Sequence, residues 1–285
     1  MKQILVISGK GGTGKTTIVA SFAALAKNAC LADCDVDAPD LHLVLKPEIK
    51  KIVEFSGSKV AVKDDSKCVD CGKCREVCRF DAVDENFNID YTLCEGCGAC
   101  VFVCQVNALK LKEKTSGQAY ISETKYGPMA HAKLNIGEEA SGKLVAIVKE
   151  NAKKIAGKEN KNLILIDGSP GLGCPVIASL SGVDLALIVT EPTISGIHDL
   201  TRILSVTKHF GVNPMVCINK YDINPENTEK IERFCEKEGI EIAGKIPFDS
   251  VVTEAMVAEK PVIEFSDGSV SKEITDMWNK INILI

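Results

Sequence analysis

The sequence lacks a long apolar run, an excess of basic residues and an apolar leader. No window reaches the roughly 18 consecutive apolar residues of a membrane-spanning helix. The first apolar stretch, Ile4 to Ile7, is too short for the core of a secretion signal. With 34 basic and 39 acidic residues the net charge is −5, so the protein lacks the overall positive charge that attracts nucleic acid. We therefore expect a cytoplasmic protein that neither inserts stably into a membrane nor binds nucleic acid.

Cysteine, by contrast, is abundant, with 13 among 285 residues. The composition is otherwise that of a globular protein, with 45% hydrophobic and 26% charged residues. A chain of this length can bury a stable core without disulfide bonds. Because we expect a reducing compartment, in which disulfides are rare, metal ligation is the expected use of so many thiols. Eight of the 13 cysteines lie between Cys68 and Cys104.

These eight cysteines form two runs of four that have the same spacing. Within each run the cysteines are separated by two, two and three residues. In two-cluster ferredoxins, three cysteines of such a run bind one iron–sulfur cube and the fourth binds the other cube. We therefore expect one [4Fe–4S] cluster on Cys68, Cys71, Cys74 and Cys104, and a second on Cys94, Cys97, Cys100 and Cys78.

The segment from about Lys59 to Leu111 resembles a bacterial two-cluster ferredoxin. It departs from that family where a proline follows the fourth cysteine, because Arg79 and Gln105 stand there. That proline ligates nothing, so the prediction of two clusters is kept. A pair of structural zinc sites is the alternative, since C-x2-C pairs also bind zinc, but the repeated four-cysteine spacing favours iron–sulfur.

A glycine-rich loop follows a predicted strand over 3–8 and precedes a predicted helix over 14–27. The loop reads Gly9-Lys10-Gly11-Gly12-Thr13-Gly14-Lys15-Thr16-Thr17. In such loops, glycines let backbone N–H groups close on phosphate oxygens, a lysine reaches the β- and γ-phosphates and a hydroxyl binds Mg²⁺. We assign the last two roles to Lys15 and Thr16 and expect ATP and Mg²⁺ as ligands. A plain strand-to-helix turn would leave the Lys-Thr pair unexplained.

Because Lys10 lies inside this loop, it has the deviant K-G-G-x-G-K-T form and resembles the MinD/ParA/Mrp and nitrogenase iron-protein group of P-loop ATPases. The resemblance implies a homodimer with two ATP molecules between the subunits, in which Lys10 reaches the partner's nucleotide. It also implies that Asp35 positions the attacking water and belongs to the Mg²⁺ site, and that Asp167 holds the Mg²⁺ shell. Asn219 and Pro247 would then contact the adenine. A cap or turn role is the alternative for each of these polar residues.

Apolar segments alternate with helical patterns along most of the chain. Strands are predicted at 3–8, 29–34, 162–167, 184–190, 214–219 and 241–246, and helices at 14–27, 138–155, 196–210, 225–238, 249–258 and 270–282. The alternation predicts an α/β fold with a doubly wound, mostly parallel sheet. We expect a P-loop ATPase core at 1–56 and 117–285, with a small α+β ferredoxin-like domain inserted at 57–116.

Three further expectations concern the borders of this arrangement. Ser56-Gly57-Ser58 and Thr115-Ser116-Gly117 would flank the insertion. Residues 118–137 would form a hairpin. The apolar stretch from Ile274 to Ile285 would pack against the sheet, because it lacks the basic excess that holds anionic lipid.

The remaining cysteines are scattered. Cys174 lies seven residues after Asp167, the interval at which the nitrogenase iron protein has a cluster ligand. By that resemblance, two copies would hold one more metal between subunits, with Cys34 as a supplementary ligand, whereas a small buried residue is the alternative. We expect Cys30, Cys217 and Cys235 to be core residues.

Together, the motifs join an ATP-driven dimerisation switch to a two-cluster electron carrier. The leading hypothesis is a slow, Mg²⁺-dependent ATPase that gates electron transfer to a partner protein or metal site. The alternative is an ATP-dependent protein that assembles or carries an iron–sulfur or other metallocofactor. A redox-sensing, MinD-like spatial organiser is a third. The partner is expected to accept electrons or a metallocofactor, and to be similar to the nitrogenase-cofactor-binding or orange-protein families.

Overall fold

The computed structural model describes residues 1–138 and 141–284, and the chain divides into two compact units. The first unit comprises Met1–Val53, Ala119–Lys133 and Ser141–Ile285, and the second comprises Glu54–Gln118 and Leu134–Ala140. All eight clustered cysteines therefore lie in the second unit. This unit extends beyond the expected insertion of 57–116 on both sides.

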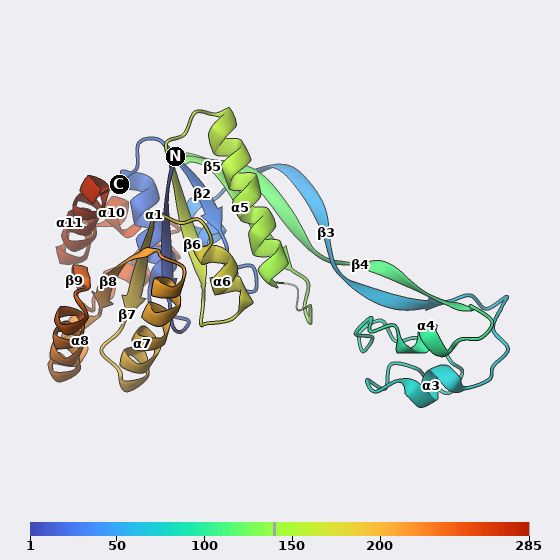
Figure 1. Cartoon of the computed structure of the whole chain (residues 1–285). Helices are drawn as coiled ribbons and strands as arrows, with labels where there is room; N and C mark the ends of the chain where they lie inside the picture. Colours follow the sequence, from blue (N-terminus) through green and yellow to red (C-terminus); the bar gives the residue numbers. More distant parts are fainter. Residues whose placement is uncertain (139–140, 285) are drawn as a thin grey trace. The chain divides into compact units, whose positions relative to one another are not determined.

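A nine-stranded sheet runs through the described residues in the order β3-β4-β5-β2-β6-β1-β7-β8-β9 (Figure 1). Each pair of neighbouring strands from β5 to β9 in this order is parallel, which confirms the expected mostly parallel α/β fold. The strands are β1 (Lys2–Ser8), β2 (Ala29–Asp33), β3 (Glu48–Lys63), β4 (Leu109–Thr124), β5 (Gly127–Leu134), β6 (Leu163–Pro170), β7 (Leu185–Thr190), β8 (Asn213–Asn219) and β9 (Glu241–Ile246).

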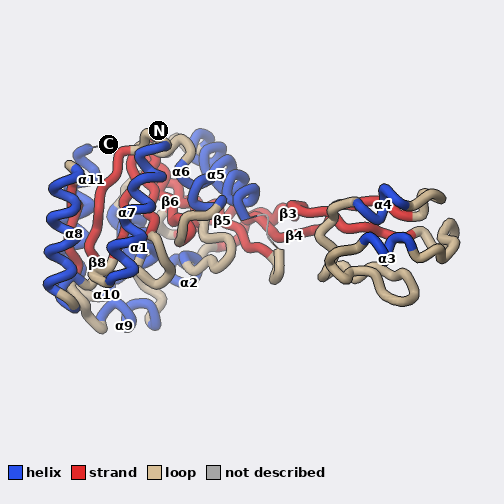
Figure 2. The backbone as a smooth tube through the Cα atoms, turned by 60° about the horizontal axis from the view of Figure 1, so that its bottom comes forward, coloured by secondary structure: helices blue, strands red, loops and turns tan. Residues whose placement is uncertain are grey.

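Two groups of helices pack on the sheet of the first unit (Figure 2). One group is α1 (Lys15–Leu25), α2 (Leu41–Leu45), α9 (Val251–Val257), α10 (Val262–Phe265) and α11 (Ser269–Leu284). The other is α5 (Ser141–Lys158), α6 (Cys174–Leu180), α7 (Ile194–His209) and α8 (Pro225–Glu238), and a short 3-10 turn, η1, covers Tyr221–Ile223. A parallel sheet is covered by helices in this way, which explains why every residue of β2 and β7 is buried.

The carboxyl-terminal helix α11 belongs to the core of the first unit. Ile274, Met277 and Ile281 are buried, and the ring centroid of Trp278 lies 5.1 Å from that of Phe22. The expected packing of this stretch is thereby confirmed. The three scattered cysteines expected in the core, Cys30, Cys217 and Cys235, are fully buried. In the part of the chain that the structure describes, no helix is both long and apolar enough to cross a bilayer.

The segments expected to flank the insertion lie within two long strands. β3 and β4 have 16 residues each and run through Ser56-Gly57-Ser58 and Thr115-Ser116-Gly117 without a break. The Ser58 and Ser116 hydroxyl oxygens lie 2.9 Å apart and share a hydrogen bond. The small residues therefore serve pairing between neighbouring strands, not chain flexibility. β5 and the end of β4 occupy the segment where a hairpin was expected.

In the second unit the two cysteine runs repeat one backbone conformation. Each run carries a short helix, α3 (Lys73–Val77) and α4 (Ala99–Val103). Gly72 and Gly98 precede these helices with φ of 76° and 80°. After them, Asp81 and Asn107 both have φ of 51°. The repetition in sequence is thus also a repetition in local structure.

Candidate nucleotide and cluster sites

The glycine-rich loop joins β1 to α1 and is packed tightly at two of its glycines. Gly14 has φ of 92°, a left-handed conformation that favours glycine, and a Cβ there would lie 2.5 Å from Asn219 Nδ2. A Cβ at Gly9 would lie 2.2 Å from Asp199 Cβ. A Cβ at Gly11 or Gly12 would meet nothing within 4 Å. The loop is therefore closely packed at both ends and has free space in the middle. It lies at the amino end of an 11-residue helix, where the helix dipole and free N–H groups favour an anion.

Thr16 and Asp167 meet beside this loop. The Thr16 hydroxyl donates a hydrogen bond of 2.7 Å to Asp167 Oδ2. Burial raises the pKa of Asp167 to about 7, although the nearby Lys15 ammonium and the Thr16 hydrogen bond oppose this rise. The second oxygen, Asp167 Oδ1, is buried without a hydrogen-bond partner. An orphaned carboxylate oxygen is costly unless a ligand satisfies it, so this place suits a cation.

Asp33 is a candidate to which the sequence analysis gave no role. It ends β2 fully buried and lies in register with Asp167 on the neighbouring β6. Burial and the Asp167 charge raise the pKa of Asp33 well above its usual range. Its Oδ2 is also buried without a partner, while Oδ1 accepts a hydrogen bond of 3.0 Å from the Asp35 N–H. Two neighbouring carboxylates with an orphaned oxygen each fit a divalent cation.

Asp35, the residue expected to position water, lies half-buried just after β2. Burial raises the pKa of Asp35 to about 6, and the Lys15 ammonium opposes that rise. Lys15 itself is buried and acts electrostatically on both Asp35 and Asp167. The structure thus brings Lys15, Thr16, Asp35 and Asp167 together around the amino end of α1.

Lys10 is held by its own chain. Its Nζ lies 2.9 Å from Glu191 Oε2, and Lys220 Nζ lies 2.6 Å from Glu191 Oε1. The Lys10 ammonium also donates a 3.4 Å hydrogen bond to the Thr193 hydroxyl. Burial pushes the pKa of Glu191 upward, but hydrogen bonds from Lys220 and Lys10 hold it below its usual value. Glu191 is therefore a buried anion that engages the two lysines at once.

Two residues were expected at the adenine: Asn219 is the last residue of β8, and Pro247 follows β9. The Asn219 amide nitrogen donates a hydrogen bond of 2.8 Å to the Thr13 carbonyl, and its oxygen accepts one of 3.0 Å from the Lys220 N–H. Each amide atom has capacity for a second bond. Pro247 is half-buried and is followed by Phe248, a residue that is 60% exposed. The structure places Asn219 directly against the loop.

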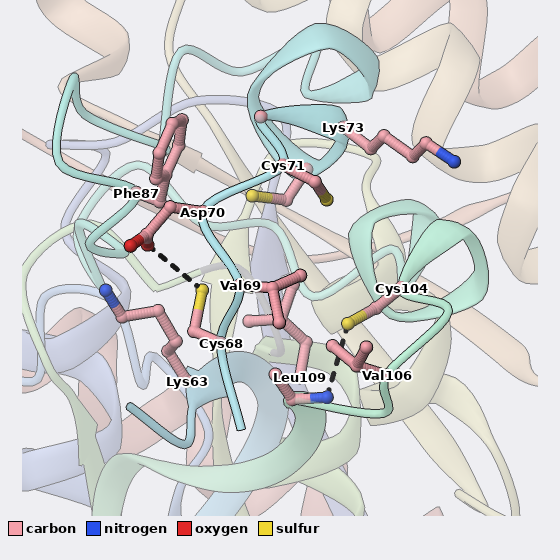
Figure 3. A pocket seen from close by; sticks show the side chains of 13 residues that line it. Lys63, Cys68, Val69, Asp70, Cys71, Lys73, Phe87, Cys104, Val106 and Leu109 are labelled. Atoms are coloured by element: carbon pink, nitrogen blue, oxygen red, sulfur yellow. Dashed lines mark hydrogen bonds between the residues drawn. The ribbon is translucent and has the colours of Figure 1, made fainter. Parts of the chain in front are cut away.

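Two cavities in the second unit each collect four cysteines. The first has about 380 Å³ of empty space, part of it open to solvent, and Cys68, Cys71, Cys74 and Cys104 line it (Figure 3). The second has about 360 Å³, also partly open to solvent, and Cys78, Cys94, Cys97 and Cys100 line it. Each cavity takes three cysteines from one run and one from the other.

Backbone and side-chain groups point at the sulfurs of both cavities. The Ala108 N–H donates to Cys104 Sγ at 3.2 Å, and the Ala61 N–H donates to Cys94 Sγ at 3.4 Å. The Cys68 thiol donates to Asp70 Oδ1 at 3.4 Å, as Figure 3 shows. Iron binding would displace this thiol proton. N–H groups directed at sulfur are among the features that tune iron–sulfur potentials.

Within residues 1–138 and 141–284, no group of three or more His, Cys, Asp or Glu side chains is arranged to hold a metal ion. The ligands of a four-iron cube are spread around the cube, whereas those of a single ion converge on one point.

Comparison with known proteins identifies the family of this chain. Residues 4–262 match the model of the CobQ/CobB/MinD/ParA nucleotide binding domain. The chain belongs to this family. It is also 38% identical over 288 residues to the "Uncharacterized protein MJ0578" of Methanocaldococcus jannaschii, across 99% of this chain and 97% of that protein.

More distantly similar proteins share the fold, and their names describe two different activities. The "Iron-sulfur cluster carrier protein" of Pyrococcus abyssi is 26% identical over 153 residues, or 48% of this chain and 51% of that protein. The cell division ATPase MinD of Pyrococcus furiosus has a TM-score of 0.60 at 19% identity, over 100% of this chain and 99% of that chain. MinD of Pyrococcus horikoshii, solved with Mg-ADP, has a TM-score of 0.60 at 18% identity, over 99% and 96%. The fold is that of MinD-like P-loop proteins.

Cys174 and Cys34 occupy different environments in this fold. Cys174 is exposed as the first residue of α6. Cys34 is fully buried, and burial raises the pKa of its thiol. Its carbonyl accepts a hydrogen bond of 2.6 Å from the Ser169 hydroxyl. Of these two thiols only that of Cys174 is exposed, and the bridging metal expected there stays a prediction.

Proposed function

We propose that this protein is a homodimeric, Mg²⁺-dependent ATPase that gates electron transfer through two [4Fe–4S] clusters to a partner protein or metal site. The observation that carries the proposal is the division of eight cysteines between two cavities, three from one run and one from the other in each. This crossed arrangement is the ligand pattern of two-cluster ferredoxins. Structural zinc sites do not require that two cysteine runs exchange their fourth ligands.

The two cavities suit iron–sulfur cubes in their chemistry as well as in their ligands. Cys68, Cys71, Cys74 and Cys104 would hold the first cluster, and Cys94, Cys97, Cys100 and Cys78 the second. Apolar residues such as Leu109 and Ile89 line the remaining walls and limit water around the sulfurs. When bound, the clusters supply one-electron redox chemistry.

The nucleotide would occupy the open side of the glycine-rich loop. The backbone N–H groups of Gly11 to Thr17 and the Lys15 ammonium would bind its phosphates, and Thr16, Asp33 and Asp167 would hold Mg²⁺. The orphaned oxygens of the two carboxylates support this assignment. Asp35 is suited to hold a proton of the attacking water, because its pKa is raised to about 6.

Dimerisation would redirect Lys10. In the single chain, Glu191 and Thr193 hold the Lys10 ammonium. Reaching the nucleotide of the other subunit requires that these contacts break, so the pairing with Glu191 opposes dimer formation until ATP attracts the lysine. ATP hydrolysis is then expected to be slow without a partner that favours the closed dimer.

The proposal is tested by anaerobic purification followed by EPR-monitored redox titration, with and without Mg-ATP. We expect about eight irons per chain, and a cluster signal or potential that changes with ATP in the wild type but not in Lys15→Ala. Clusters that are present but indifferent to ATP would overturn the gating proposal. Absence of iron after anaerobic reconstitution would overturn the cluster assignment itself.

Assembly or transport of a metallocofactor is the second candidate. Its support is the similarity of about half of this chain to proteins named iron-sulfur cluster carriers. Ligation by eight cysteines argues against it, since four protein thiolates hold a cube tightly whereas a carrier must release its cargo. Transfer of iron to an apo-ferredoxin on ATP addition would favour this candidate. A MinD-like spatial organiser has no support beyond the shared fold.

A further inference from the structure

The two cavities of the second unit are lined by equivalent residues. The second cysteine run begins 26 positions after the first, and each described residue that lines one cavity has a counterpart 26 positions away that lines the other. Side-chain hydrogen bonds repeat as well. Asp64 Oδ1 accepts from the N–H and the hydroxyl of Ser66. Asp90 Oδ1 accepts the same pair from Thr92. Each cavity therefore serves as a reference for the other, position by position.

The charges at these equivalent positions differ. Three charged residues line the first cavity, and their counterparts in the second are uncharged: Lys63 with Ile89, Asp70 with Gly96 and Lys73 with Ala99. Of the described residues that line the second cavity, Glu95 alone is charged, and its counterpart in the first is Val69. Two lysines and one aspartate give the first lining a formal charge of +1, whereas Glu95 gives the second a formal charge of −1.

Two other features that set the potential of an iron–sulfur cluster are closely matched between the cavities. These features are hydrogen bonds to the sulfurs and exposure to solvent. In each cavity a backbone N–H donates to a cysteine sulfur, at 3.2 Å in the first and 3.4 Å in the second. Cys71 and its counterpart Cys97 are both exposed. The charge of the lining is therefore the principal difference between the two sites.

Lys63 carries the charge at the first cavity that water screens weakly. In Figure 3 its ammonium lies on the side of the cavity that carries Cys68 and Asp70. The Lys63 side chain is 13% exposed, whereas that of Asp65, whose Oδ1 lies 3.0 Å from Lys63 Nζ, is 84% exposed. Water therefore screens the Asp65 carboxylate more than the Lys63 ammonium. The Asp70 carboxylate opposes the two lysines of the lining, and the net formal charge stays positive.

We propose that these charges order the two clusters, so that the cluster of the first cavity has the higher potential and is reduced first. Reduction adds one negative charge to a cluster, so a positive lining stabilises the reduced form and a negative lining destabilises it. An electron on the second cluster then passes to the first, which gains one electron as the second loses one. This inference rests on the proposed function, in which each cavity holds a [4Fe–4S] cluster. Lys63, Lys73 and Glu95 give the transfer its direction.

The repeat supplies variants in which one cavity takes the residues of the other. Lys63→Ile with Lys73→Ala gives the first cavity the uncharged counterparts from the second. Glu95→Val gives the second cavity the counterpart from the first, and it tests the same charge difference if the double variant does not load iron. Lys112→Ala is the control, because Lys112 is an exposed lysine on β4 that lines neither cavity.

Each full-length protein is loaded with iron and sulfide anaerobically and reduced stepwise with dithionite while EPR spectra are recorded. We expect the first electron to give the spectrum of Cys78→Ser, a variant that should retain only the first cluster. The double lysine variant should lower the equilibrium constant for reduction of the higher-potential cluster about tenfold, equal to about 59 mV. Glu95→Val should raise the potential of the other cluster, and Lys112→Ala should change neither.

The outcomes separate this inference from the function on which it rests. If the first electron gives the spectrum of Cys104→Ser, which should retain only the second cluster, or of both clusters equally, the proposed order is overturned while the two clusters stand. The same holds if the double lysine variant shifts the lower-potential cluster. If the charge variants behave as expected and ATP changes neither potential, the order stands and the gating proposal falls. A protein that binds zinc in place of iron would overturn both.

Discussion

The side chain of Asn219 is hydrogen-bonded to the backbone of Thr13, 206 residues earlier in the chain. Its amide nitrogen occupies the space where a Cβ at Gly14 would lie, so the end of β8 closes one wall of the glycine-rich loop. This contact fixes the turn from which α1 begins. It also makes Asn219 a structural support of the loop in addition to a candidate contact for adenine.

Replacing Asn219 with alanine should weaken both the loop and nucleotide binding. The variant leaves the Thr13 carbonyl without its donor, so we expect a loss of about 1 kcal/mol in the free energy of unfolding. ATP affinity should fall about tenfold, the equivalent of roughly 1.4 kcal/mol. Urea unfolding and equilibrium binding measure the two effects. Asn213→Ala, at the exposed start of the same strand, is the control and should change neither.

Glu191→Gln should destabilise the nucleotide-free chain in a pH-dependent way. The wild-type carboxylate has a lowered pKa because Lys220 and Lys10 bond to its ionised form. A lowered folded-state pKa gives stability that is present above the unfolded value and is lost as the pH falls through the folded value. We expect the variant to lose about 2 kcal/mol at pH 7 and less as the pH approaches 4. Thermal unfolding across this range measures it.

A matched control and a second readout sharpen this test. Glu229→Gln removes an exposed pair with Arg233 and should cost well under about 1 kcal/mol at any pH. Because Glu191→Gln also loosens Lys10, its dimer should form at a lower ATP concentration than that of the wild type. An unchanged dimer threshold would show that Glu191 does not restrain Lys10.

Asp167→Asn should stabilise the nucleotide-free protein at neutral pH while abolishing Mg²⁺-dependent hydrolysis. The pKa of Asp167 is raised from 3.8 to about 7, so the folded state holds a proton that the unfolded state releases. The wild-type free energy of unfolding should therefore fall as pH rises from about 4 to about 7, by up to about 4 kcal/mol, and then level off.

The asparagine variant should show a smaller slope, and the part that remains comes from Asp33, whose pKa is also raised by burial. Chemical denaturation at a series of pH values measures the difference. Asp276→Asn, an exposed change on α11, keeps the wild-type profile. Added Mg-ATP should raise the stability of the wild type at pH 7.5 and leave Asp167→Asn nearly unchanged. A full slope in the variant would mean that another group carries the raised pKa.

Cys104→Ser should remove the first cluster although Cys104 belongs to the second run. We expect iron to fall from about eight to about four per chain, with the remaining cluster bound by the other cavity. Cys78→Ser should remove the other cluster, and the two variants should have complementary EPR spectra. Cys235→Ala, in the core of the first unit, should keep all the iron. Loss of both clusters in each single variant would contradict two independent cavities.

Cys174→Ala tests the bridging metal at the dimer interface. If the exposed thiols of two subunits hold a metal, the ATP-bound dimer of the variant should contain less iron than that of the wild type. Metal analysis of the isolated dimer decides this. Unchanged iron per dimer would leave Cys174 as an ordinary exposed residue at the start of α6.

The sequence predicts those parts of the molecule that depend on spacing within a short segment. Strand, loop and helix at 3–27 follow from local patterns, and so does the repeated cysteine spacing. A role for Asp33 could not be predicted, because it depends on the pairing of β2 with β6, which brings Asp33 beside Asp167, 134 residues later in the chain. The pairing of Lys10 with Glu191 likewise depends on where β7 ends. The strand at 48–63 was not predicted, because its composition is rich in lysine and its neighbour β4 follows the cysteine runs in the chain.

The unbroken course of β3 and β4 restricts how the connection between the two units can change in evolution. A flexible linker tolerates insertion of any length, but strand side chains alternate with a period of two. One residue added near Ser58 would turn every later side chain of β3, up to Lys63, to the opposite face and separate the Ser58 hydroxyl from Ser116. Lengthening is therefore tolerated in pairs of residues on both strands together, in steps of about 6.6 Å. Homologous chains should differ here by even numbers.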